Sequence, residues 1–240
     1  MCTLIVFRNV DPRYPLVIAA NRDERPTRPT RNPAEFGGGV YAPLDLVHKG
    51  TWIGVNHHGL TASLTNRFLA PRHHGRRSRG LLVTEALAAR TTAHAVAAIL
   101  LRPAGTYNGF QLVVDDGREA ALVWSDAGEY FIEKLESGIW VFTGDDDAPG
   151  RSARETMVRH WLRTGPDRLD PDRLKRLLSF HARDPETGTC VHGPGVTMET
   201  VFSMIIRRPA DNRALEIHWR AGRPCHNGRW QRGVVPVDQP

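Results

Sequence analysis

The sequence predicts an α+β fold, a four-layer αββα sandwich in which helices cover two antiparallel sheets. A strand-rich first third is followed by two helices, a run of strands, two further helices and closing strands. Because strands mostly follow strands, an alternating parallel arrangement is disfavoured. A length of 240 residues is enough to bury a substantial core without requiring two domains. We therefore predict a single domain over residues 1–240.

The first third of the chain contains four apolar segments of strand length. They are Cys2–Phe7, Pro15–Ala20, Thr51–Asn56 and Leu60–Thr65. The repeated prolines of Arg25–Pro33 predict a loop, which Gly37, Gly38 and Gly39 close. A turn at His57, His58 and Gly59 joins the third and fourth strands.

The pattern changes to a helical period behind Ser78, a candidate N-cap, and continues to Ala89. A second helix follows over Ala93–Leu101, and Pro103 ends it. Helices are also predicted over Ser152–Arg163 and Asp170–Ala182, where Asp170 caps and Pro171 takes the first helical position. The remaining strands are Phe110–Val114, Ala120–Trp124, Tyr130–Leu135 and Ile139–Thr143, which form a meander, and then Val201–Arg207 and Ala214–Trp219.

The composition is that of a globular protein. Hydrophobic residues make up 40% and charged residues 24% of the chain, which is too apolar for disorder. No apolar window is long enough for a membrane span, and the N-terminus lacks the features of a secretory signal. We therefore expect a cytoplasmic protein whose cysteines, Cys2, Cys190 and Cys225, are thiols.

The formal net charge of +6 favours anionic partners. The arginines concentrate at residues 25–31 and 72–79, where a solvated surface is the simplest interpretation. Nucleic-acid binding is disfavoured because no aromatic platform or recognition motif accompanies these arginines. We expect a small-molecule substrate or ligand of anionic character, and the sequence does not define an oligomeric state.

Cys2 directly follows the initiator Met, and cysteine is small enough to permit removal of Met1. Cleavage would leave a thiol and a free α-amine on one residue. The α-amine has an ordinary pKa of about 7.7–8.0 and can accept the thiol proton at neutral pH. One residue then supplies both nucleophile and base. A small side chain in an edge strand is the alternative interpretation of Cys2.

Four polar residues, Asn21, Arg22, Asp23 and Glu24, directly follow the second apolar strand. Polar groups at the end of a buried strand need partners. If this strand forms a hairpin with Cys2–Phe7, its end lies beside the start of the chain. Asp23 could then hold the α-amine, Arg22 could lower the thiol pKa, and Asn21 could donate a hydrogen bond.

The N-terminal Met1-Cys2-Thr3 and the segment Ala20–Glu24 resemble the NRDE family of transport-and-Golgi-organisation-2-like proteins, which is named for that tetrapeptide. Two further segments look like its second and third motifs, and they are Asp45–Asn56 and Gly59–Arg67. The family is similar to penicillin V acylases and bile-salt hydrolases, which are cysteine N-terminal-nucleophile (Ntn) hydrolases. The resemblance implies an Ntn-hydrolase-like fold, Cys2 as nucleophile and Asp23 as the residue that orients its amine.

Two departures from the amidase pattern stand out. Ala20 occupies the position of an arginine, and Gly144 occupies that of an asparagine that donates to the oxyanion. Losing one such donor costs about 10²–10³ in rate, and we infer that Asn66 could replace it. We expect a hydrolase or acyltransferase acting on an amide or thioester through a Cys2 acyl-enzyme. The alternative, implied by family links to haem handling and to lipid or acyl-CoA metabolism, is a non-catalytic carrier of an anionic amphipathic ligand.

We assign Glu24, Trp52 and Arg67 to substrate binding, with packing as the alternative role of Trp52. A further cluster of possible metal ligands comprises Cys190, His192, Cys225 and His226. Their spacing is not that of a zinc finger, and nothing in the sequence forces the two pairs together. We therefore predict no metal and no cofactor.

Overall fold

The computed structural model describes residues 2–69, 71–126, 128–144, 153–163, 169–183 and 187–238 of the chain. These residues form two antiparallel sheets and four helices, which confirms the α+β class. The contacts group into two compact units. The first unit comprises Met1–Thr27, Ser137–Ala210 and Glu216–Val234, and the second comprises Arg28–Glu136, Asp211–Leu215 and Val235–Pro240.

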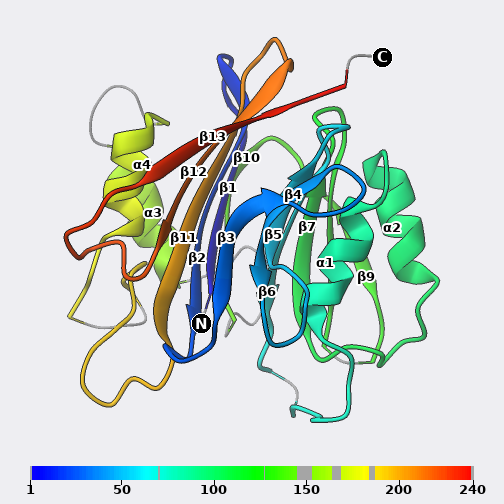
Figure 1. Cartoon of the computed structure of the whole chain (residues 1–240), viewed down its shortest axis with the longest axis horizontal. Helices are drawn as coiled ribbons and strands as arrows, with labels where there is room; N and C mark the ends of the chain where they lie inside the picture. The colour runs from blue at the N-terminus through cyan, green and yellow to red at the C-terminus, as the bar shows by residue number, and fades with distance from the viewer. Residues whose placement is uncertain are drawn as a thin grey trace. The chain divides into compact units, whose positions relative to one another are not determined.

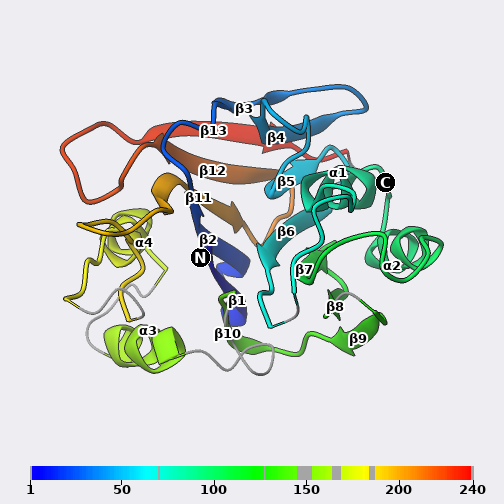
Figure 2. The same ribbon diagram turned by 90° about the horizontal axis from the view of Figure 1, so that it is seen from below.

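The first sheet has six strands in the order β10-β1-β2-β11-β12-β13 (Figure 1). Their bounds are Gly138–Phe142 for β10, Thr3–Asp11 for β1, Tyr14–Glu24 for β2, Glu199–Arg208 for β11, Ala214–Ala221 for β12 and Gln231–Pro236 for β13. Helices α3 (Ala153–Arg163) and α4 (Pro171–Leu178) lie on one face of this sheet (Figure 2). Ile5, Ala19 and Ile205 pack there against helical leucines to form the core of the first unit.

Strands β1 and β2 form the predicted hairpin. Thr3 lies opposite Asn21, and Phe7 lies opposite Val17. This register brings the end of β2 to the start of the chain, as the sequence analysis expected. Strand β2 is longer than predicted, because Asn21–Glu24 continue it and pair with β11. The polar tetrapeptide is therefore part of the sheet rather than a segment that follows it.

The second sheet has seven strands in the order β3-β4-β5-β6-β7-β8-β9. Their bounds are Thr30–Glu35, Val40–Asp45, Ile53–Asn56, Thr61–Asn66, Phe110–Asp115, Ala120–Ser125 and Phe131–Lys134. Helices α1 (Arg79–Leu87) and α2 (Thr92–Leu100) pack on it through Leu82, Ala86 and Ile99, which belong to one buried cluster with residues of β6 and β7. Each sheet thus has its own pair of helices.

Several predicted elements need correction. Part of the predicted loop Arg25–Pro33 is strand β3, in which a register shift between Arg31 and Ala34 accommodates the proline. Strands β4 and β13 were not predicted. Strand β10 does not continue the meander after β9, because it pairs with β1 in the first sheet. Helix α4 ends at Leu178 rather than Ala182.

The predicted helix starts are mostly confirmed. Ser78 is the N-cap of α1, although its side chain makes no cap hydrogen bond, and Asp170 caps α4 with Pro171 in its first turn. Ser152, the predicted start of the third helix, lies outside the described residues, and the described helix begins at Ala153. In the described part of the chain, none of the helices is both long and apolar enough to cross a membrane.

Candidate active site

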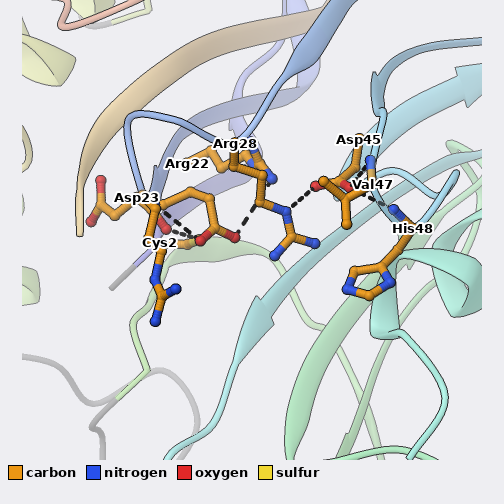
Figure 3. A network of polar contacts seen from close by, with 9 residues as sticks. Cys2, Arg22, Asp23, Arg28, Asp45, Val47 and His48 are labelled. Carbon is orange, nitrogen blue, oxygen red and sulfur yellow. Dashed lines mark hydrogen bonds and ion pairs between the residues drawn. The ribbon is translucent and has the colours of Figure 1, made fainter. Parts of the chain in front are cut away.

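Cys2 lies just before β1 and beside the end of β2. Its Sγ atom is 3.9 Å from the main-chain oxygen of Asp23, at the distance of a weak thiol hydrogen bond. Figure 3 shows the two residues side by side, with Arg22 next along the strand. The hairpin therefore delivers the predicted nucleophile and its predicted carboxylate to one place.

Asp23 is almost completely buried, with 2% of its surface exposed. Burial raises the pKa of its carboxyl group to about 6, against an ordinary value of 3.8. The hydroxyl of Thr200 donates to Oδ1 at 2.6 Å, and the positive charge of Arg154 lies nearby. Both lower the pKa of Asp23 and so favour the carboxylate. At neutral pH the group is mostly ionised.

The thiol of Cys2 has a raised pKa. Burial is the largest cause, and the adjacent Asp23 carboxylate adds to it by repelling a thiolate. The residue as a whole is half-buried. Arg22 acts in the predicted direction and lowers this pKa, yet it is outweighed. The neutral thiol is therefore the resting form, because burial and Asp23 together raise its pKa by more than Arg22 lowers it.

Asn21 donates hydrogen bonds, as predicted, and the partners seen here are main-chain oxygens of the first unit, while a catalytic role for it stays a prediction. Its side-chain nitrogen donates to the main-chain oxygens of Leu178 at 2.9 Å and Thr189 at 2.6 Å. Its side-chain oxygen accepts from the hydroxyl of Ser203 at 2.6 Å. The amide thus joins β2 to β11, to the end of α4 and to the segment that follows it. Asn21 positions the sheet that carries Asp23.

The remaining residues of the tetrapeptide lie near this site. Arg22 is buried, and its guanidinium lies 3.6 Å from the carboxylate of Glu24. Glu24, the predicted substrate-binding residue at this end of β2, is half-buried and also accepts from the main-chain nitrogen of Arg25. Glu24 therefore lies at the partly exposed end of β2, in the same unit as Cys2.

The structure adds residues that the sequence analysis missed. Arg154 on α3 is buried and donates to the hydroxyl of Thr3 at 2.8 Å. Thr200 and Ser203 come from β11, about 180 positions along the chain from the residues that they contact. Arg154 is one of many arginines in the sequence, and nothing in its sequence neighbourhood indicates that its charge lies near Asp23. The two hydroxyl residues lie in an apolar strand, which is a weak signal for internal partners.

Three predicted site residues belong to the second unit and are described within it. Asn66 ends β6 and is half-buried. Arg67 is buried, pairs with Asp126 at 2.6 Å and stacks over Trp124, with 4.9 Å from its guanidinium carbon to the ring centre. Trp52 is buried next to β5. Their roles in oxyanion stabilisation and substrate binding stay predictions.

The second motif, Asp45–Asn56, contains residues that shape the second unit. Asp45 accepts from the main-chain nitrogens of Val47 and His48, and it pairs with Arg28 at 2.7 Å; Figure 3 includes this network. Asn56 donates to the main-chain oxygens of Leu87 and Ala89 at the end of α1. These motif positions therefore hold turns and a helix end.

Both departures from the amidase pattern are visible. Ala20 is a buried core residue of β2, opposite Leu4 and Met204. Gly144 lies just beyond β10 and offers no side-chain donor, while Asp145 lies outside the described residues.

A second cluster of reactive side chains lies in the first unit. Cys190, His192 and Cys225 each direct one ligand atom into a common volume, in which these atoms lie within 4.8 Å of one another. The ring of His226 contacts His192 edge-on, with 5.6 Å between ring centres, and is not one of the three. The fold thus brings Cys190 and His192 close to Cys225, although nothing in the sequence indicated that these segments are neighbours.

Residues 1–146 match the sequence profile of the family described as Transport and Golgi organisation 2. This match covers more than half of the chain. The chain belongs to this family.

Curated members of the Transport and Golgi organisation 2 family agree with that assignment. The Bos taurus homologue is 37% identical over 129 residues, and the Homo sapiens homologue is 34% identical over 128 residues. Each alignment covers 48% of this chain and 45% of the relative. The matched region is therefore about half the length of the curated relatives.

Solved structures show that this family member has an Ntn-hydrolase-like fold. The Caenorhabditis elegans ortholog of N-acylethanolamine-hydrolyzing acid amidase matches with a TM-score of 0.59 and 14% identity, covering 85% of this chain and 92% of that one. A mutant conjugated bile acid hydrolase from Clostridium perfringens matches with a TM-score of 0.54 and 8% identity, covering 100% and 97%. At such low identities the likeness concerns the fold alone.

Proposed function

We propose that this protein is a cysteine Ntn hydrolase or acyltransferase that cleaves an amide or thioester through an acyl group on Cys2. The observation that carries the proposal is the position of Cys2 at the end of the β1–β2 hairpin, where its Sγ lies 3.9 Å from the main-chain oxygen of Asp23, a residue whose carboxylate is buried. A buried, ionised carboxylate next to the start of the chain is well placed to hold an ammonium group. The α-amine of Cys2 would be that group once Met1 is removed.

The raised pKa of the thiol explains why a base is needed. A thiol that burial and Asp23 keep protonated at neutral pH is a weak nucleophile. An adjacent amine with an ordinary pKa of about 7.7–8.0 can accept the proton in the same step as attack. The ammonium that forms is then stabilised by the Asp23 carboxylate. The same carboxylate that opposes a free thiolate thus favours the concerted transfer.

The proposed reaction has two steps, acylation of Cys2 and hydrolysis of the resulting thioester. The amine takes the thiol proton, and sulfur bonds to the substrate carbonyl carbon. The tetrahedral intermediate then expels the leaving amine or thiol, which receives that proton, and a thioester remains on Cys2. Water, deprotonated by the freed amine, attacks the thioester, and the acid leaves as the thiol is restored. In the acyltransferase version, another nucleophile replaces water.

One feature supports the competing proposal of a non-catalytic carrier for an anionic amphipathic ligand such as haem, acyl-CoA or a lipid. Gly144 supplies no side-chain donor where the related amidases have an asparagine, and the predicted replacement is Asn66. Lacking one oxyanion donor lowers kcat by about 10²–10³. A protein without a replacement could bind an acyl compound without turning it over, so the two proposals differ in a measurable rate.

The experiment combines mass and activity. Intact mass measures whether Met1 is removed, and the processed protein is assayed against a panel of N-acyl amides and acyl thioesters with acidic head groups. We expect hydrolysis by the processed protein and none by Cys2→Ala. A matched variant with a bulky residue inserted between Met1 and Cys2 retains Met1 and the thiol but has no amine on Cys2, and it should also be inactive.

Equal turnover by Cys2→Ala would exclude the acyl-enzyme. Full turnover by the insertion variant would exclude the amine as base. Tight binding of an acyl compound by both processed wild type and Cys2→Ala, with no turnover by either, would establish the carrier in place of the enzyme.

A further inference from the structure

The loops beside the candidate active site contain two cysteines and several histidines that the proposed reaction does not use. Cys190 and His192 lie between α4 and β11, and Cys225 lies between β12 and β13. Cys190 is buried, while the other two are half-buried. Sulfur and imidazole nitrogen are the ligands that Zn²⁺ prefers.

We propose that Cys190, His192 and Cys225 form a binding site for a Zn²⁺-class cation with an open fourth coordination position. The three ligand atoms lie within 4.8 Å of one another. With metal–sulfur and metal–nitrogen bonds of roughly 2.0–2.3 Å, the edges of a tetrahedral site measure about 3.5–3.8 Å. The observed spacing accommodates a cation after small side-chain rotations.

The lone pair of His192 already faces the sulfur cluster. Its Nε2 is 3.0 Å from Sγ of Cys225, as expected when the thiol donates to an unprotonated ring nitrogen. A cation that displaces the thiol proton can take up the same lone pair. Two thiolates then neutralise the charge of a divalent ion, so the occupied site carries no net charge. Binding releases two protons from the free thiols.

The orientation of His192 is fixed by its neighbours. The ring of His181 stacks on it, with 4.1 Å between ring centres and 9° between planes. His181 is itself held because its Nδ1 lies 3.0 Å from the main-chain oxygen of Cys190, an acceptor to which it must donate. The ring of His181 thus contacts two of the proposed ligands, stacking on His192 and donating to the main chain of Cys190.

The backbone around both cysteines is held before any cation arrives. The main-chain nitrogen of Cys190 donates to Phe180 at 3.0 Å, and that of Val191 donates to the hydroxyl of Thr200 at 2.8 Å. Next to Cys225, the main-chain oxygen of Pro224 accepts from Ser179 at 2.9 Å and from Arg220 at 3.0 Å. Ligands on a fixed backbone lose little freedom on binding, which favours affinity.

Among the described residues, three protein atoms converge, which favours an open site over a closed structural one. Catalytic zinc sites commonly have three protein ligands and a water, whereas closed sites have four. His226 contacts His192 without joining the group of ligand atoms. A second group, His57, His58 and Asp238, lacks sulfur and has an exposed carboxylate, so its response to a cation should differ spectroscopically.

The test uses the full chain, reduced with a phosphine, stripped by a chelator and titrated with Co²⁺ as the probe. We expect one Co²⁺ per chain, with an intense sulfur-to-metal band in the near ultraviolet and the visible bands of a tetrahedral ion. Cys190→Ser and Cys225→Ser should each lower the intensity of the sulfur-to-metal band, because one of the two thiolates is lost, and should weaken binding beyond the roughly 10–100-fold loss typical of an outer partner. His192→Ala should weaken binding similarly.

Two matched variants define the site further. Cys2→Ser removes the third cysteine and should leave the Co²⁺ spectrum unchanged. His226→Ala should also leave it unchanged, and loss of the tetrahedral bands there would contradict the open fourth position. A sulfur band of undiminished intensity and unchanged affinity in both Cys190→Ser and Cys225→Ser, or no sulfur band in reduced wild type, would overturn the proposal.

A measurement on wild type alone covers the case in which the variants fail to fold. Zn²⁺ should protect Cys190 and Cys225 from alkylation by at least about tenfold, as located by peptide mass, while Cys2 reacts as before. Unchanged alkylation of Cys190 and Cys225 in the presence of Zn²⁺ would overturn the proposal. So would their recovery as a disulfide under the same reducing conditions.

Discussion

The hydroxyl of Thr200 donates to Oδ1 of Asp23 at 2.6 Å, across the paired strands β2 and β11. The same hydroxyl accepts from the main-chain nitrogen of Val191 at 2.8 Å. Its single proton is therefore directed at the carboxylate. This hydrogen bond lowers the pKa of Asp23 and so favours the charged form of the buried carboxylate.

Thr200→Val should raise the pKa of Asp23 further, because the bond that favours the carboxylate is lost. The acid limb of the pH–rate profile, which we assign to Asp23, should move to higher pH. Two buried polar groups also lose their partner, so the free energy of unfolding should fall by about 1–3 kcal/mol. Thr200→Ser keeps the hydroxyl and is the matched control. It should restore both the position of the acid limb and the free energy of unfolding. An unshifted acid limb in Thr200→Val would show that another group governs it.

Asp23 should also make stability depend on pH. Its folded pKa of about 6 exceeds the ordinary 3.8, so between these values the folded state binds the additional proton. Stability should therefore fall as the pH rises from about 4 to about 6 and then level off. Asp23→Asn cannot titrate, and urea unfolding of the two proteins across this range should show its advantage over wild type growing with pH. A constant difference between them would contradict the raised pKa.

Arg154 should affect Asp23 through its charge. It is buried beside Thr3, and its positive charge lowers the pKa of Asp23. In Arg154→Met that pKa should rise, which NMR titration of the aspartate carboxyl carbons can follow. Arg154→Lys keeps the charge and should recover most of the shift. If Arg154→Met and Arg154→Lys shift the pKa of Asp23 by the same amount, the effect of Arg154 is not electrostatic.

Asn21 should matter for stability. Asn21→Ala leaves the main-chain oxygens of Leu178 and Thr189 and the hydroxyl of Ser203 without this partner. We expect the free energy of unfolding to fall by roughly 2–4 kcal/mol, measured by urea denaturation. Ser203→Ala removes only one of these bonds and should cost about 1 kcal/mol. Equal losses of unfolding free energy in Asn21→Ala and Ser203→Ala would mean that the bonds from the Asn21 amide nitrogen contribute little.

The hairpin that forms the site could be predicted from sequence because it is local. Two apolar runs separated by a short polar turn specify the β1–β2 pair, and the pair places Asp23 beside Cys2. The role of Asn21 could not be predicted in the same way. Its partners come from α4, the segment after α4 and β11, and nothing in the neighbourhood of residue 21 indicates them.

Long-range pairing also explains the errors in the predicted fold. Residues 138–142 follow β9 directly and have the pattern of another meander strand, yet they pair with β1. Strand β3 contains Pro33, which signals a loop unless a register shift accommodates it. The proximity of Cys190 and Cys225 could not be predicted, because neither lies in a regular element and no periodicity relates them.

The most direct test of the central claim is to trap the acyl group on the chain. The processed protein is mixed with an activated acyl ester bearing an acidic group, quenched in acid within seconds and digested for peptide mass. We predict one acyl group per chain, on the N-terminal Cys2 peptide, and none in Cys2→Ala. Acylation confined to Cys190 or Cys225, or absent from a processed protein that still turns substrate over, would contradict Cys2 as the nucleophile.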